Sequence, residues 1–174
     1  LVLLAAAVGV TIWRYESALG QYQNEVLSAR DDAQRVDDAI AAFWQEQAAI
    51  FSYVLETKDE TLVQLDTARK DFVRNLGEIH VQTQAEADLR NRALAANRAS
   101  ITNFIENVKP ALSGPSGQSL GDALAQQNQF SNSVIPPLNQ LSDVESRKAD
   151  EAVAAAKGAG NEALIAGLIA GILS

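Results

Sequence analysis

The side chains capable of acid, base or metal chemistry in this chain of 174 residues are carboxylates and a single histidine, His80. One histidine without any cysteine cannot build a metal site. Near a predicted helix end, we expect a surface or capping residue rather than a pH switch or ligand contact. The pairs Asp31, Asp32 and Asp37, Asp38 lie away from the apolar stripe of their predicted helix. They therefore indicate a solvated helix face rather than two carboxyl groups that converge on a pocket for acid–base catalysis.

No other pattern in the sequence predicts an enzyme. There is no nucleophile with an adjacent base, no glycine-rich phosphate loop and no metal-ligand spacing. The sequence thus predicts no catalytic residue, no cofactor and no metal.

Two polar residues fall at positions where an apolar side chain is expected. Arg69 stands in the register between Leu65 and Phe72, and a charge there needs a partner or a bound anion. This makes Arg69 the candidate ligand-binding residue. In the simpler interpretation the Arg69 side chain extends to solvent and Ala68 takes the core position. Gln47 interrupts an otherwise apolar heptad seam, where it is expected to set register or dimer pairing.

Composition favours helices and argues against nucleic acid as a partner. The net charge is −8, whereas nucleic-acid binding needs a basic surface. Hydrophobic residues make up 47% of the chain but aromatic residues only 6%, which suits closely packed helices better than a sheet. The lack of cysteine excludes disulfides.

Hydrophobic periodicity and capping signals predict four helices. Apolar residues alternate in steps of three and four from Leu19 to Val54, as in a coiled coil, which predicts a first helix over 14–56. Capping boxes of the form T-x-x-E begin at Thr57 and Thr83, and they predict further helices over 59–82 and 84–110. Pro110 and a loop at 113–117 end the third helix.

The fourth predicted helix covers 119–160 and contains two weak points. Pro136 and Pro137 each remove a backbone donor, so we expect a kink or short break there. Gly158 and Gly160 form a second soft spot that could act as a hinge. The predicted fold is all-α: an up-down-up-down antiparallel four-helix bundle whose long first and last helices run into truncated transmembrane helices.

Apolar runs at both ends carry the prediction of membrane segments. Each run, 1–13 and 161–174, is shorter than a full span, since 13 residues of helix reach roughly 20 Å against ~30 Å of hydrocarbon. We expect the end of one transmembrane helix and the start of a second, with the bundle over 14–160. Trp13, Arg14 and Tyr15 suit the membrane interface, and Lys157 would lie just outside the second membrane helix. A cleaved signal peptide is the rival interpretation of the first run.

A family resemblance rests on the end of the first predicted helix and the start of the second. The segment from Gln47 to Asp59, followed by Leu62, Ala68 and the stretch 72–76, resembles the third type of CHASE domain. The ligand-binding bundle of methyl-accepting chemotaxis receptors is similar in layout. The turn reads ETKDE here and lacks the glycine of that family. The resemblance implies a parallel homodimer, a small-molecule or protein signal outside the cytoplasm, and an output domain beyond the second membrane helix.

These features together predict the extracytoplasmic sensory domain of a membrane-bound bacterial signalling receptor of the histidine kinase, cyclase or chemoreceptor type. It would lie in the inner membrane, with lipid at both ends of the chain, and transmit a stimulus by helix displacement. The alternative is a secreted or envelope-anchored helical scaffold or binding module with no signalling output.

Overall fold

The structure is a computed structural model that describes the backbone at residues 2–114 and 119–172, and side chains at 20, 23–114 and 119–159. Every element within these residues is helical, and α3, η1 and α4 join without a gap into one rod. The described residues therefore form the four helical rods that the sequence predicts. The elements are α1 (Val2–Glu56), α2 (Asp59–Gly77), α3 (Gln84–Asn103), the π-helical turn η1 (Phe104–Val108), α4 (Lys109–Ser113) and α5 (Leu120–Ile172).

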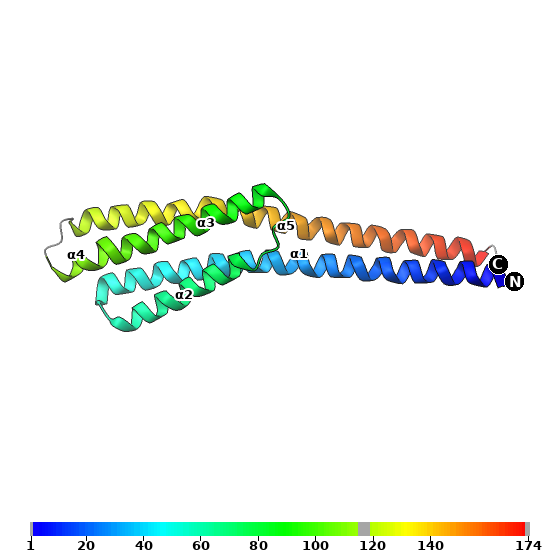
Figure 1. Ribbon diagram of the computed structural model, residues 1–174, viewed down its shortest axis with the longest axis horizontal. Coiled ribbons are helices and arrows are strands. Elements are labelled where there is room, and N and C mark those ends of the chain that lie inside the picture. Colours follow the sequence, from blue (N-terminus) through cyan, green and yellow to red (C-terminus); the bar gives the residue numbers. More distant parts are fainter. Residues whose placement is uncertain (1, 115–118, 173–174) are drawn as a thin grey trace. The chain divides into compact units, whose positions relative to one another are not determined.

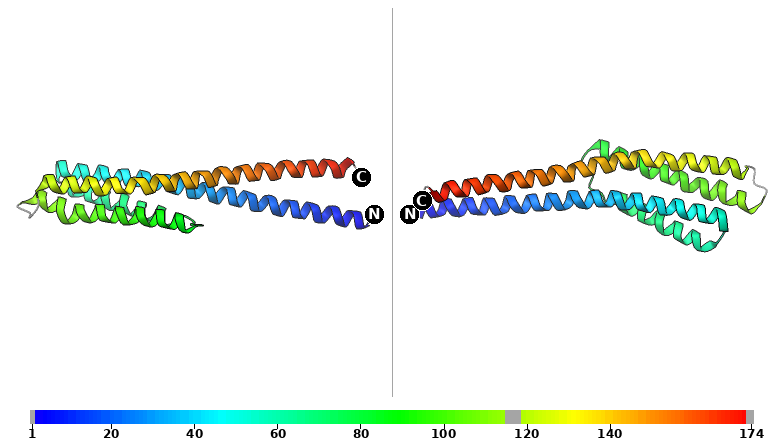
Figure 2. Two further views of the ribbon diagram at one scale, coloured as in Figure 1. Left: turned by 90° about the horizontal axis from the view of Figure 1, so that it is seen from above. Right: turned by 180° about the vertical axis from the view of Figure 1, so that it is seen from behind.

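The chain divides into two compact units. The larger unit, residues 32–144, contains the end of α1, the start of α5 and all of the elements between them. Its rods run alternately up and down as a four-helix bundle (Figure 1). The smaller unit contains residues 1–31 and 145–174, where the remaining parts of α1 and α5 run in opposite directions (Figure 2).

The bundle core consists of two hydrophobic clusters that follow one another along α1. The first hydrophobic cluster includes Phe43 and Phe72, whose ring centroids are 6.4 Å apart. The second hydrophobic cluster includes Tyr53 and Phe104, which meet edge to face at 5.6 Å. Both clusters draw on α1, α2, the α3–η1–α4 rod and α5, so each joins all four rods.

The turn between α1 and α2 differs from its prediction. Thr57 does not begin a capping box: the residue that precedes α2 is Lys58, which makes no side-chain cap hydrogen bond. Thr57 instead ends α1, with φ of 52° and its backbone N–H donating to the Tyr53 carbonyl at 2.8 Å. This is a left-handed helix-ending conformation that usually takes glycine. Only Thr57 and Lys58 separate the two helices. Because Thr57 ends α1, Lys58 occupies the N-cap position of α2.

The connection between α2 and α3 confirms one capping box and corrects one helix end. Thr83 Oγ1 accepts from the Glu86 backbone N–H at 3.2 Å, and Glu86 Oε2 accepts from the Gln82 N–H at 2.8 Å. However, α2 ends at Gly77 rather than at 82. The chain leaves the helix because Ile79 packs into the first hydrophobic cluster and the backbone N–H of His80 donates to Asp32.

Asp32 was expected on a solvated face, and this prediction is wrong. Its side chain is buried, and its Oδ1 accepts from the His80 backbone N–H at 3.1 Å and lies 3.1 Å from Nδ1 of the same residue. Asp31, Asp37 and Asp38 are exposed as predicted. His80 is also exposed, so the pair fixes a loop rather than forming a pocket.

The third rod continues past Pro110, where the sequence predicted its end. In η1 the Lys109 N–H donates to the Phe104 carbonyl, five residues back. A proline ring in a regular α-helix clashes with the carbonyl four residues before it, here that of Glu106. The wider π-turn gives the Pro110 ring space, and the rod then runs to Ser113.

Helix α5 passes through both predicted weak points. It is helical from Leu120 to Ile172 with Pro136 and Pro137 inside it, so of the expected kink or short break the break does not occur, and the kink stays a prediction. Gly158 lies within the same helix, and the side-chain surroundings of Gly160 lie outside the described residues. A search of the described helices finds none with a stretch sufficiently long and apolar to span a membrane.

Candidate functional site

A layer of buried polar side chains separates the two hydrophobic clusters of the bundle. Glu46 and Gln47 bring it to α1, between cluster residues on either side. Glu46 Oε2 accepts from Asn97 Nδ2 of α3 at 2.5 Å, and Gln47 Oε1 accepts from Ser131 Oγ of α5 at 2.8 Å. Two neighbouring positions of one helix thus bond to two different helices across the core.

The polar layer continues between α3 and α5. Gln127 Nε2 donates to Ser100 Oγ at 2.8 Å, and Gln127 Oε1 accepts from Asn103 Nδ2 at 2.9 Å. Asn103 Nδ2 also donates to the Ala123 carbonyl at 3.3 Å, and Asn103 Oδ1 accepts from Asn107 Nδ2 at 2.9 Å. We call the buried members of this network the polar layer: Glu46, Gln47, Asn97, Ser100, Asn103, Gln127 and Ser131.

Glu46 is the ionisable member of the polar layer. Its removal from water raises the pKa of the carboxyl from 4.5 to about 7, although the Asn97 hydrogen bond and the charge of Arg69 oppose that rise. Glu46 Oε1 and Gln47 Nε2 have no hydrogen-bond partner among the described residues. The polar layer therefore contains two unpaired polar atoms and a carboxyl whose pKa is raised to near neutral.

Arg69, the candidate ligand-binding residue, lies at the edge of a groove. Ala68 takes the core position and Arg69 is exposed, as the simpler interpretation predicted. The groove has a volume of about 260 Å³ and lies between α2 and the α3–η1–α4 rod. We call it the α2–α3 groove, and its lining residues are Leu62, Leu65, Asp66, Arg69, Ile101, Phe104, Ile105 and Lys109.

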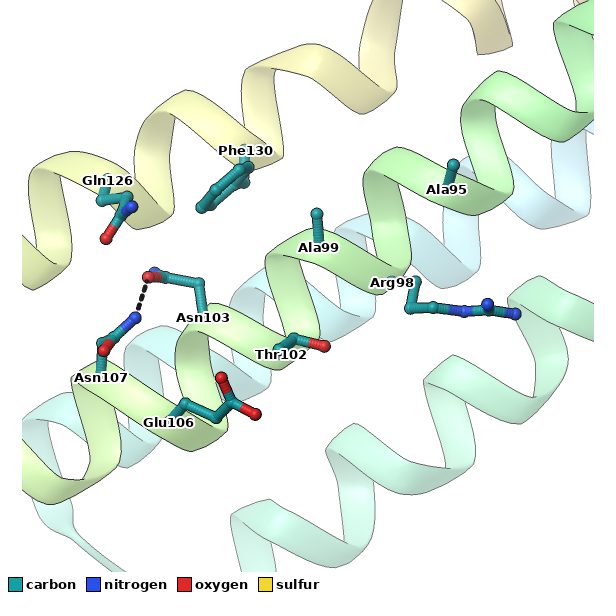
Figure 3. A pocket seen from close by; sticks show the side chains of 9 residues that line it. All are labelled: Ala95, Arg98, Ala99, Thr102, Asn103, Glu106, Asn107, Gln126 and Phe130. Carbon is teal, nitrogen blue, oxygen red and sulfur yellow. Dashed lines mark hydrogen bonds between the residues drawn. The ribbon is translucent and has the colours of Figure 1, made fainter.

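Two other grooves flank the bundle. The α3–α5 groove, of about 420 Å³, reaches the polar layer at Asn103. Figure 3 shows Phe130 of α5 opposite Ala99 and Asn103 of α3. The α1–α2 groove has a volume of about 410 Å³. Its lining includes Gln45, Ser52 and Thr67 and contains no charged side chain. Residues that line the α3–α5 groove are Ala95, Arg98, Ala99, Thr102, Asn103, Glu106, Asn107, Gln126 and Phe130.

A second apolar seam runs along the outside of α1. Trp44, Phe51 and Leu55 are 54%, 60% and 81% exposed, although large apolar side chains are usually buried. Ala41 and Ala48 are also exposed, and the five positions alternate in steps of three and four. We call these five residues the α1 outer seam. They repeat the heptad spacing of a coiled coil on the face turned away from the bundle core.

The remaining predicted residues do not gather into a site. Lys157 is exposed, whereas the side chains of Trp13, Arg14 and Tyr15 lie outside the described residues. Gln47 is buried in the seam as predicted, and its bond to Ser131 shows that it aligns α1 with α5 of the same chain. Among the described residues, no group of His, Asp and Glu is arranged to hold a metal ion.

Sequence reasoning missed the polar layer, although the sequence contains a signal for it. Asn97, Ser100 and Asn103 interrupt the apolar positions of α3 at helical spacing, as Gln127 and Ser131 do on α5. Polar residues at inward positions of several helices form one shared layer only if they lie at the same height in the bundle. That alignment is seen in the structure and not in the sequence.

Comparison of the chain with protein-family models, curated proteins and solved structures yields no match. The site must therefore be interpreted from its own chemistry. It combines a buried carboxyl that titrates near neutral pH with a groove whose arginine acts on that carboxyl. This arrangement suits binding and conformational coupling, because a change in the charge at Arg69 alters the protonation of Glu46.

Proposed function

We propose that this chain is the extracytoplasmic sensory region of a membrane-bound signalling receptor, in which a stimulus displaces packed helices. The observation that carries the proposal is the continuity of α5 from Leu120 to Ile172. The first part of α5 contributes Gln127 and Ser131 to the polar layer, and the last part belongs to the smaller unit. A shift of α5 in the bundle would pass along an uninterrupted helix.

The polar layer supports the proposal because its hydrogen bonds are incomplete in the observed arrangement of the helices. Packed helices move between discrete arrangements rather than deforming continuously. A buried carboxyl with one unpaired oxygen makes the observed arrangement less favourable than a fully satisfied core would be. A stimulus therefore needs to supply only a small free-energy difference to favour another arrangement.

The membrane part of the proposal rests on composition. The described parts of the two apolar runs, 2–13 and 161–172, lie in α1 and α5. In the proposal these runs belong to two membrane helices of the inner membrane, with lipid around them and the bundle outside the cytoplasm. A histidine kinase, a cyclase or a chemotaxis signalling domain would then receive the signal.

The test is a phase experiment on α5 in a chimaera that joins this chain to a kinase of known output. Inserting one alanine after Ala154 rotates everything beyond it by about 100° about the helix axis. Inserting seven residues restores the rotational phase to within about 20°. We expect the single insertion to change kinase activity and the seven-residue insertion to preserve it. Equal activity after both insertions would contradict transmission through α5.

The proposal includes a parallel homodimer, and the α1 outer seam supports it. Two parallel copies of one heptad seam place identical positions opposite each other, which is the geometry of a dimeric coiled coil. We expect Phe51→Glu to convert a dimer to a monomer in sedimentation velocity. Val73→Glu is the matched control, because Val73 is also an exposed apolar residue, on α2. Dissociation by both substitutions, or by neither, would contradict the assignment of the α1 outer seam as the dimer interface.

A helical scaffold or binding module without signalling output is the second candidate. The exposed α1 outer seam favours it, because the same seam could pair with a different helical protein. A chain that is monomeric alone, and a chimaera whose output ignores the insertions in α5, would support this function instead.

A further inference from the structure

We infer that the α2–α3 groove binds a small organic carboxylate with an apolar body. This inference deepens the proposed sensory function by naming the class of its ligand. Only the signalling consequence of binding rests on that proposed function, because the binding itself can be measured on this chain alone.

The shape and lining of the groove limit the ligand to a small molecule with apolar surface. Its volume is about 260 Å³, just below the range typical of pockets for drug-sized ligands. Leu65, Ile101 and Phe104 are buried members of the second hydrophobic cluster, so the floor of the groove is the bundle core itself. A ligand seated on this floor would cover the apolar side chains of Leu62 and Ile105, which are not fully buried.

The charges of the groove favour an anion. Two cations line it, Arg69 from α2 and Lys109 from the start of α4. The acid in the lining, Asp66, is already paired with Lys70, whose Nζ lies 2.6 Å from its carboxylate. Lys109 lies over the Tyr53 ring, 5.9 Å from its centroid, a contact with a neutral side chain that adds no negative charge to the groove.

The other two grooves do not offer this combination. The α3–α5 groove carries one cation, Arg98, and one acid, Glu106, so its lining has no excess of positive charge. The α1–α2 groove contains no charged residue. Only the α2–α3 groove, among the grooves described, combines an apolar floor with an excess of positive charge. A planar carboxylate suits a guanidinium, which can donate two parallel hydrogen bonds to it.

The π-turn forms part of the wall of the groove. Phe104 and Ile105 of η1 both line the groove, and π-turns occur frequently at functional sites. Ile105 is 52% exposed, an unusual position for a large apolar side chain. A bound apolar group would cover it.

Arg69 connects the groove to the polar layer. Its positive charge favours the ionised form of Glu46, which is buried in the core. A carboxylate bound at Arg69 would offset that charge and so favour the protonated form of Glu46. Ligand binding on the surface would thereby change the charge inside the core, without any contact between the ligand and the polar layer.

The test measures binding of benzoate and hexanoate to the whole chain by nuclear magnetic resonance and calorimetry. We expect saturable binding with chemical-shift changes at 62–69 and 101–109. Arg69→Gln should weaken it about tenfold or more, because it removes a charge-assisted hydrogen bond. Arg98→Gln is the matched control, because it removes the same charge from an exposed arginine of a different groove. Circular dichroism confirms that both variants remain folded.

Two further probes separate charge from apolar contact. Benzyl alcohol has the apolar body alone and inorganic phosphate the charge alone, so both should bind more weakly than benzoate. The inference is overturned if benzoate moves no groove resonance, if Arg98→Gln weakens binding as much as Arg69→Gln, or if benzyl alcohol binds as tightly. Binding without any response of the kinase chimaera would leave the site standing and refute the sensory function. A chimaera whose kinase activity depends on the length of the insertion in α5, in a chain that binds no carboxylate, would support the sensory function and refute the binding site.

Discussion

Replacing Glu46 by glutamine should make the bundle more stable at alkaline pH and leave it nearly unchanged in acid. Glutamine keeps the oxygen that accepts from Asn97 Nδ2 and removes the titrating proton. The side chain is fully buried, so the change acts in the core and not at the surface.

The magnitude follows from the difference between the folded and unfolded pKa of Glu46. Burial raises that pKa from 4.5 to about 7. Between these values the folded chain holds a proton that the unfolded chain has released, so the free energy of unfolding falls as pH rises. Each pKa unit is worth about 1.4 kcal/mol, so the wild type should lose about 3 kcal/mol relative to Glu46→Gln between pH 4 and pH 8.

The assay is urea unfolding followed by circular dichroism at several pH values, for both proteins. Other titrating groups are common to the two chains and cancel in the difference. Glu106→Gln removes the same charge from an exposed side chain of η1, and we expect its effect to stay within about 0.5 kcal/mol at every pH. A carbon NMR titration of the Glu46 carboxyl should give a midpoint near 7, moving higher in Arg69→Gln.

Two outcomes would refute this reasoning. One is a stability difference between the wild type and Glu46→Gln that does not vary with pH. The other is a Glu46 midpoint at the ordinary value for a carboxyl, which would mean that water reaches the polar layer.

Three further predictions concern the local structure of the bundle. Thr57→Gly should raise the free energy of unfolding by about 1 kcal/mol, since a β-branched residue is strained at the φ of 52° that glycine adopts freely; urea unfolding checks this, and a loss of stability would contradict it. Thr83→Ala should lower stability by about 1 kcal/mol through loss of the cap to the Glu86 N–H, and an unchanged midpoint would mean that water replaces the hydroxyl. Pro110→Ala should return 104–108 to regular α-helix, visible as changed amide shifts over that segment, because the ring no longer needs the wider turn; persistence of the π-turn would assign it another cause.

The number of rods and several helix ends could be predicted from the sequence because they depend on local signals. The capping box at Thr83 and the starts of α2 and α3 are as predicted. The same T-x-x-E pattern failed at Thr57, because the residue also had to end α1. A local pattern indicates which bonds a side chain can make, and the length of the connection decides which of them it makes.

The polar layer and the π-turn could not be predicted in the same way, because they depend on contacts between helices. Ile105 belongs to the apolar positions of α3 if the helix keeps 3.6 residues per turn throughout, yet it is exposed. The π-turn widens the helix at that position and changes which side chains face inward. Arg69 was the predicted ligand-binding residue, and the structure places it at the α2–α3 groove. Its neighbour Ala68 takes the core position, which explains how Arg69 reaches the surface.

The polar layer also limits how far the helices can travel. A slide of α5 by one helical turn, about 5.4 Å, would carry Gln127 and Ser131 away from Ser100, Asn103 and Gln47 and set them against apolar neighbours. Each buried polar group left without a partner costs about 1–3 kcal/mol, so such a stroke is strongly opposed. Rotation, tilt or a shift of an ångström or two keeps these donors and acceptors within reach. The polar layer thus limits the displacement of α5 to movements that keep these hydrogen bonds.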